Sequence, residues 1–109
     1  MATAYKVLGQ SNPAATTNTS LYTVPAATSA VVSTITVANL GASAGTFRVA
    51  IRPSGAAIDN KHYIAYDTTI AALDTLTLTL GITLATTDVV TVYASSATMS
   101  FNAYGSEIS

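Results

Sequence analysis

The chain has 109 residues, a length typical of one domain and sufficient to bury an independent hydrophobic core. Four basic and five acidic residues give a formal net charge of -1, and only 8% of the chain is charged, whereas typical soluble domains have about 25%. This composition gives no support to binding of nucleic acid or of an anionic membrane, and the absence of cysteine excludes disulfides and thiolate metal sites.

The N-terminal region begins with alternating residues and continues into a turn-rich stretch. Residues 4–9 (AYKVLG) predict a first strand, and residues 10–20 (QSNPAATTNTS) favour turns. We therefore expect residues 1–20 to form an edge strand and a loop, with an extended arm as the alternative. Residues 21–109 are expected to form a β-sandwich domain. Its first strand, over 21–25 (LYTVP), ends at a proline, which cannot donate to a ladder.

Two strands show the strongest alternation in the first half of the chain. Residues 30–39 (AVVSTITVAN) are the longest β-branched run, and residues 46–52 (TFRVAIR) alternate regularly. One face of the first strand is expected to carry Val31, Ile35 and Val37, and the other face Val32, Thr34 and Thr36. In the second strand, Phe47, Val49 and Ile51 are expected to point to the core, and Thr46, Arg48, Ala50 and Arg52 away from it.

The next strand is predicted over residues 61–68 (KHYIAYDT). Its alternation places Ile64 and Tyr66 inward and Tyr63 outward. Residues 69–74 (TIAALD) then predict a turn or a single helical turn.

Threonine and leucine alternate in the following strand, and the leucines predict an inward row of Leu76, Leu78 and Leu80. Gly81 is a candidate β-bulge, after which Ile82 and Leu84 would bend around a corner. Residues 88–94 (DVVTVYA) and 98–105 (TMSFNAYG) complete the predicted strands.

These elements predict an all-β fold, a single antiparallel β-sandwich or jelly-roll-like domain of about eight short strands. The threonines opposite the leucine row would form a polar but uncharged face, in which hydroxyl groups pair across strands. Such a face suits flat packing against another protein, because little charge must be desolvated there. A chain with so few charged residues is also poorly protected against aggregation, and this favours a function within a larger assembly.

No catalytic, cofactor-binding or metal-binding motif is present. His62 is the only histidine, and without a G-x-S-x-G elbow it is expected to be a structural imidazole bonded to backbone or water. The scattered polar residues Asp59, Asn60, Asp67, Asp74 and Asp88 are expected to bond turns of the backbone and not calcium. Glu107 is the only glutamate and gives no carboxylate pair of the glycosidase type.

The residues best suited to contacting a partner are arginine, lysine and tyrosine side chains predicted on outward rows or in the N-terminal segment. They are Tyr5, Lys6, Arg48, Arg52, Tyr63 and Tyr104. Arg48 and Arg52 could grip carboxylates of a partner; alternatively they are solvated or pair locally with Asp59 or Asp67. An exposed tyrosine can bury a large area in an interface while few rotatable bonds are fixed. The remaining tyrosines of the chain, Tyr22, Tyr66 and Tyr93, are expected in core or rim packing.

Four segments together resemble small virion structural proteins of tailed bacteriophages, especially phages of aquatic bacteria such as cyanophages. They are LYTVPAATSAVVSTITVAN (21–39), FRVAIRPSGA (47–56), NKHYIAYDTTIAALDTLTLTLGITLATTDVVTVYAS (60–95) and SFNAYGSEIS (100–109). The resemblance is one of strands and turns, and it supplies no functional residues by position.

The resemblance implies a non-enzymatic protein of the virion exterior, made in the host cytoplasm, whose partners are the major capsid protein or other virion proteins. Because the chain is one domain without the long helices or coiled-coil heptads of most fibres, it looks more like an add-on subunit than a fibre shaft. We therefore expect a capsid cement or decoration protein, and symmetry then leads us to expect a dimer or trimer. A tail, baseplate or fibre-associated adaptor is the first alternative. A carbohydrate-binding module is the second, with exposed aromatic side chains in a groove on one sheet face.

Overall fold

The structure is a computed structural model that describes residues 2–109. It contains eight strands and two short 3-10 helices. The strands are β1 (Thr3–Ser11), β2 (Thr19–Thr23), β3 (Ser29–Asn39), β4 (Gly45–Arg52), β5 (Tyr63–Ile70), β6 (Thr75–Leu84), β7 (Val89–Ala94) and β8 (Met99–Ile108). The helical turns η1 (Pro53–Gly55) and η2 (Asn60–His62) lie between β4 and β5. No helix in the described part of the chain has the length and apolar character needed to cross a bilayer.

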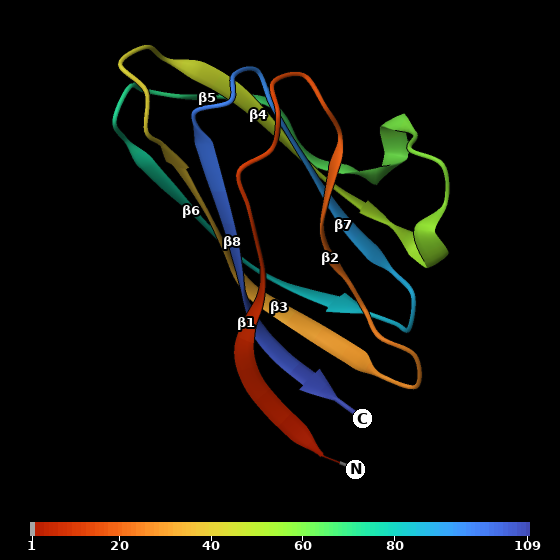
Figure 1. The fold of residues 1–109 in the computed structure, drawn as a ribbon. Coiled ribbons are helices and arrows are strands. Elements are labelled where there is room, and N and C mark those ends of the chain that lie inside the picture. The colour runs from red at the N-terminus through yellow and green to blue at the C-terminus, as the bar shows by residue number, and fades with distance from the viewer. Residues whose placement is uncertain (1) are drawn as a thin grey trace.

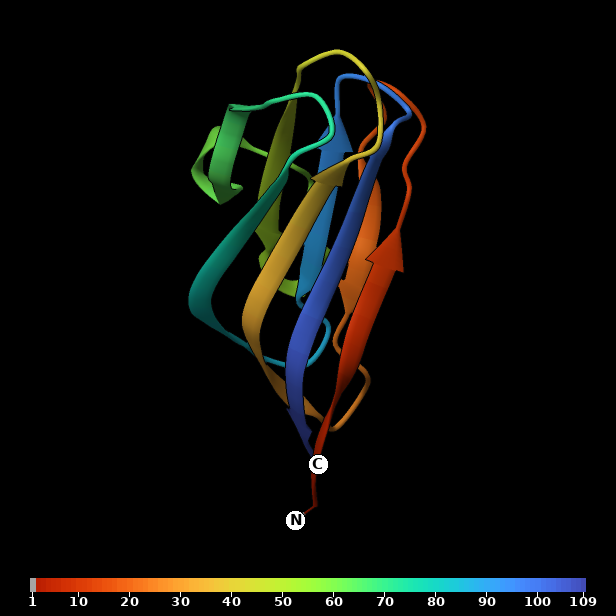
Figure 2. The same cartoon turned by 90° about the vertical axis from the view of Figure 1, so that its left-hand side faces the viewer.

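The strands form two antiparallel four-stranded sheets, with the orders β1-β8-β3-β6 and β2-β7-β4-β5. Figures 1 and 2 show the sheets as two facing layers with the chain termini at one end. The all-β antiparallel sandwich predicted from the alternation is therefore confirmed. β1 pairs with β8 along its length, so residues 3–11 form an edge strand of the first sheet and not an extended arm.

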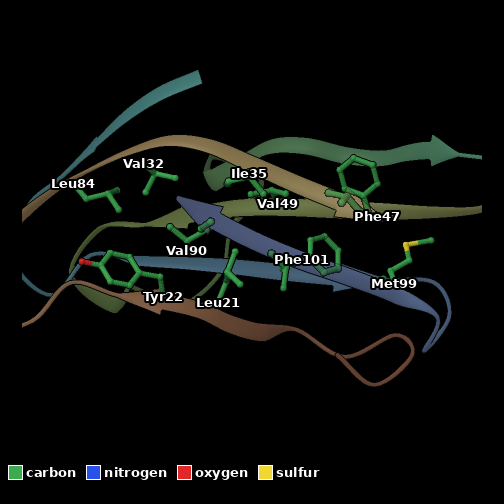
Figure 3. Close-up of a cluster of buried hydrophobic side chains, with 14 of the residues drawn as sticks. Leu21, Tyr22, Val32, Ile35, Phe47, Val49, Leu84, Val90, Met99 and Phe101 are labelled. Carbon is green, nitrogen blue, oxygen red and sulfur yellow. The ribbon is translucent and has the colours of Figure 1, made fainter. Parts of the chain in front are cut away.

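The core lies between the inner faces of the two sheets (Figure 3). Phe47 of β4 and Phe101 of β8 are fully buried and meet edge to face, with their ring centroids 6.1 Å apart. Ile35, Val49 and Met99 are also fully buried around them. Burying side chains of this size contributes roughly 1.5–3 kcal/mol each, which makes this layer the main source of stability.

The inward row of β3 differs from the prediction. Val32 is buried with Ile35 and Val37, whereas Val31 is only partly buried. The pairing of β3 with β8 shifts between Val32 and Thr34, so that Ser33 is an extra residue on its strand. Because a bulge of one residue reverses the alternation, the prediction that Val31 shares the face of Ile35 and Val37 is wrong.

The same irregularity affects β6. Leu76 and Leu78 pack against the core as predicted, but Leu80 is 50% exposed, so its predicted inward position is wrong. The pairing with β3 shifts at this point, and Gly81 has a φ of 63°, in the left-handed region that favours glycine. After this bulge Ile82 and Leu84 return to the core, as expected for a strand that turns a corner.

β5 also departs from its predicted orientation. Ile64 is 46% exposed and Tyr66 is 56% exposed, while the small Ala65 between them packs against the core. The pairing of β5 with β4 shifts twice, on either side of Val49, and Asp67 has a positive φ of 48°. These irregularities bring Ala65 opposite Val49, so the predicted inward positions of Ile64 and Tyr66 are wrong.

Candidate interaction surfaces

The six residues predicted to contact a partner lie on two opposite faces of the sandwich. Tyr5, Lys6 and Tyr104 line one open depression on the sheet β1-β8-β3-β6. The other three residues, Arg48, Arg52 and Tyr63, belong to β4 and β5 of the second sheet. The structure therefore divides the predicted set into two separate surfaces, and each has a different chemistry.

The outer face of the first sheet is made of aligned rows of uncharged side chains. Cross-strand pairing produces the rows Gln10–Asn102–Thr36–Thr77, Val7–Tyr104–Thr34–Thr79 and Tyr5–Ser106–Val31–Thr83. We call these residues the neutral face. Thr77 and Thr79 are exposed, and Gln10 Nε2 donates a 2.7 Å hydrogen bond to Asn102 Oδ1. In the register of β3 with β6, Thr34 lies opposite Thr79 and Thr36 lies opposite Thr77.

The depression on the neutral face lies around Gly105. A Cβ atom at Gly105 would stand 1.9 Å from the carbonyl oxygen of Val31, so no side chain fits there without moving a strand. Tyr5, Val7 and Tyr104 are exposed beside it, with exposed fractions of 86%, 48% and 37%. The glycine thus allows β3 and β8 to approach closely at the Ser33 bulge.

The strands of this sheet contain only two charged residues, and these neutralise each other. Lys6 Nζ lies 2.8 Å from Glu107 Oε1, and the Tyr22 hydroxyl donates a 2.6 Å hydrogen bond to Glu107 Oε2. The hydrogen bond from Lys6, then that from Tyr22, lowers the pKa of Glu107 below its ordinary value. Burial, followed by the hydrogen bond to Glu107, raises the pKa of Tyr22 above its ordinary value. Lys6 is therefore committed to an internal pair, although half of its side chain is exposed.

The second sheet carries a cluster of charge and aromatic rings on its outer face. The guanidinium carbon of Arg48 lies 4.2 Å from the ring centroids of both Tyr66 and Tyr93. Its Nε and Nη2 atoms donate to the two carboxylate oxygens of Asp67, at 2.6 and 3.3 Å. The hydrogen bond from Arg48 lowers the pKa of Asp67. Tyr63 completes the cluster, with its ring edge-on to Tyr66 at 4.8 Å.

Both arginines make local contacts in this structure. The local pair of Arg48 with Asp67, one of the alternatives raised from the sequence, is the arrangement observed. Arg52 bonds to neither predicted acid; it donates to Thr91 Oγ1 and to the carbonyl oxygens of Gly55 and Ala56. Sequence alternation missed Tyr66 as part of this surface, because the bulges of β5 that expose it leave no mark on the residue pattern.

The remaining polar residues stabilise turns. His62 is buried and its Nδ1 accepts a hydrogen bond from the backbone N–H of Asp59, which is the structural role expected for it. Asp74 accepts from the N–H of Thr75, and Asp88 accepts from the N–H groups of Ser54 and Ala85. Within residues 2–109, no group of three histidine, cysteine or acidic side chains is placed to hold a metal ion.

Comparison of the chain with protein-family models, with curated protein sequences and with solved structures found no match.

Proposed function

We propose that this protein is a non-enzymatic virion structural protein, a capsid cement or decoration subunit that binds the assembled shell of a tailed bacteriophage and stabilises it. The observation that carries the proposal is the neutral face, a broad sheet surface of threonine, tyrosine and amide side chains. The only two charged residues in its strands, Lys6 and Glu107, form an internal ion pair. On this proposal the protein lies on the particle exterior, and its partners are the major capsid protein or other virion proteins.

A surface of this kind is suited to contact with a flat protein lattice. Removing hydroxyl and amide groups from water costs much less than removing unpaired charges, and hydroxyl groups can form new hydrogen bonds with a neighbour. Exposed tyrosines such as Tyr5 and Tyr104 supply large contact areas at a small cost in side-chain entropy. A ligand that binds only the assembled shell stabilises that shell by mass action.

The first test is the copy number of this chain in purified particles, measured by quantitative mass spectrometry against the major capsid protein. Hundreds of copies in a simple ratio to the capsid subunit support the decoration role. A handful of copies would place the protein in the tail as an adaptor, and its absence from particles would overturn both virion roles.

The second test asks whether the neutral face makes the contact. Thr36→Glu introduces a charge at the centre of the neutral face, and Thr46→Glu introduces the same charge on the opposite sheet. Both threonines are partly buried strand residues, so the two variants are matched. Shells that lack the protein should bind the Thr46 variant normally and the Thr36 variant at least about tenfold more weakly, which corresponds to about 1.4 kcal/mol. Equal binding of both variants would exclude the neutral face as the contact.

A carbohydrate-binding module is the second candidate, and one observation favours it. Asn60, Tyr63 and Tyr66 line a separate depression on the second sheet, where Tyr66 is 56% exposed. Aromatic rings beside an amide are a common way of holding a sugar ring through stacking and hydrogen bonds. A glycan array distinguishes the two candidates: binding that is lost in Tyr66→Ala supports the module, and an array without binding removes it.

A further inference from the structure

The edge strand β6 has a free side. It forms the last strand of the sheet β1-β8-β3-β6, and β3 is its only hydrogen-bonded neighbour among the described strands. Figures 1 and 2 show no described segment lying against that free side. Such a strand presents a row of unpaired backbone N–H and C=O groups, which can pair with a strand of another chain.

The other three edge strands carry features that discourage pairing. β1 has Lys6 near its middle, and β2 is only five residues long with a register shift after Ser20. β5 is irregular, with two register shifts and Asp67 at positive φ. β6 is ten residues long, contains no charged residue and no proline, and pairs regularly with β3 from Thr75 to Thr79. Charge, shortness and bulges are the usual protections of sheet edges. β6 as a whole is not short, and its residues 75–79 have neither a charge nor a register shift.

The alternation of threonine and leucine in β6 is self-complementary. If two copies of β6 run antiparallel about a two-fold axis at Thr77, Thr75 faces Thr79 and Leu76 faces Leu78. About an axis at Leu78, Thr77 faces Thr79 and Leu76 faces Leu80. A slip of one residue would place threonine opposite leucine and turn each side chain to the wrong face of the sheet. The sequence of this edge therefore favours a second copy of itself, in one of two registers.

We propose that β6 is a homodimer interface, in which two copies join antiparallel within residues 75–80, before Gly81, and merge their sheets into one continuous sheet across the two-fold axis. The bulge at Gly81 ends the straight part of the edge, so it limits the pairing to this segment. The contact is isologous, because each copy contributes the same β6 edge. Neither β6 edge remains free once two copies have joined, so the assembly closes as a dimer. The neutral faces of the two copies then form one uncharged surface of twice the width.

This inference is independent of the proposed function, because a dimer can form whether or not the chain binds a shell. Its first test is sedimentation velocity over a series of concentrations. The unmodified chain should sediment with twice the mass of one chain. The double variant Thr77→Lys/Thr79→Lys places lysines opposite each other in either register, so its dimer dissociation constant should rise at least about tenfold.

Three comparisons separate this interface from a general effect of charge. The variant Thr23→Lys/Thr69→Lys adds the same charge at exposed positions on β2 and β5, and it should dimerise normally. The variant Thr77→Glu/Thr79→Glu should be monomeric alone and should form mixed dimers with the lysine variant. A monomeric unmodified chain, or a lysine variant in β6 that dimerises as well as the control, would overturn the proposal.

Crosslinking gives a second measurement that does not depend on added charge. The natural chain has no cysteine, so one introduced thiol reports on its own surroundings. Directly opposed strand residues have Cβ atoms about 4.5–5.5 Å apart, within the reach of a disulfide after a small adjustment. Under mild oxidation Thr77→Cys should form a covalent dimer if the axis lies at Thr77. If the axis lies at Leu78, only a mixture of Thr77→Cys and Thr79→Cys should do so. Thr23→Cys is the control, because this residue lies on another edge strand. If neither experiment with β6 yields more covalent dimer than this control, the pairing of β6 is contradicted.

Discussion

The Tyr22 hydroxyl donates a 2.6 Å hydrogen bond to Glu107 Oε2 and so joins the two sheets of the sandwich. Tyr22 belongs to β2 of one sheet, and Glu107 belongs to β8 of the other. The tyrosine ring lies in the core (Figure 3), and Lys6 contacts the second carboxylate oxygen from the adjacent strand β1. This bridge lets a carboxylate at the margin of the core remain ionised.

The bridge should contribute measurably to stability. We expect Tyr22→Phe and Glu107→Gln each to lower the free energy of unfolding by about 1.5–3 kcal/mol, the usual value for a hydrogen bond to a charged group. Urea denaturation of both single variants and the double variant should give a coupling energy of at least about 0.5 kcal/mol. Lys6→Met is the matched control and should cost less than about 1 kcal/mol, because this side chain is half exposed. Additive single effects would contradict the bridge.

The same contacts predict a loss of stability at both extremes of pH. The folded-state pKa of Glu107 is lowered, so its contribution is present above the unfolded value of about 4.3 and is lost as the pH falls through the folded value. The pKa of Tyr22 is raised, so its contribution is present below the unfolded value of about 10 and is lost as the pH rises toward the folded value. Thermal unfolding across pH should show both declines. Glu107→Gln should flatten the acid side, and Tyr22→Phe should flatten the alkaline side.

Arg48 should stabilise the second sheet mainly through the rings that enclose it. Each cation–π contact at an exposed site contributes about 0.5–1 kcal/mol. Arg48→Gln removes the contacts with both tyrosine rings, so it should lower the free energy of unfolding by about 1–2 kcal/mol. Asp67→Asn should cost less, and its effect should shrink in high salt, because the carboxylate is exposed. Melting temperatures at low and high ionic strength measure both effects. If Asp67→Asn costs as much stability as Arg48→Gln at low salt, the ion pair and not the rings accounts for the effect of Arg48.

Gly105 should tolerate no larger residue. Gly105→Ala places a methyl group 1.9 Å from the Val31 carbonyl oxygen, and we expect a loss of about 2–3 kcal/mol or more as the strands move apart. Gly81→Asn is the control, since Gly81 has no atom within 4 Å of a built Cβ and asparagine accepts its positive φ. Chemical denaturation measures the free energy of unfolding of both variants. An equal loss in Gly105→Ala and Gly81→Asn would contradict the close approach of β3 and β8.

Periodicity alone located most of the fold. The regular alternation in residues 46–52 and 75–79 correctly predicted strands and inward residues such as Phe47 and Leu78, because side chains in a regular strand alternate between its two faces. The same rule failed at Val31, Leu80 and Tyr66. Each of these residues lies beside a shift in strand pairing, and a bulge depends on the neighbouring strand as much as on its own sequence.

The candidate surfaces show the same division. By itself, the sequence determined that the chain is an antiparallel β-sandwich and that one strand carries an uncharged threonine face, since both properties follow from local alternation and composition. Only the tertiary structure decided that Tyr5 and Tyr104 share one surface while Arg48 joins Tyr66 and Tyr93 on the other. Strand order and pairing register bring residues distant in the chain together, and these depend on packing between the sheets.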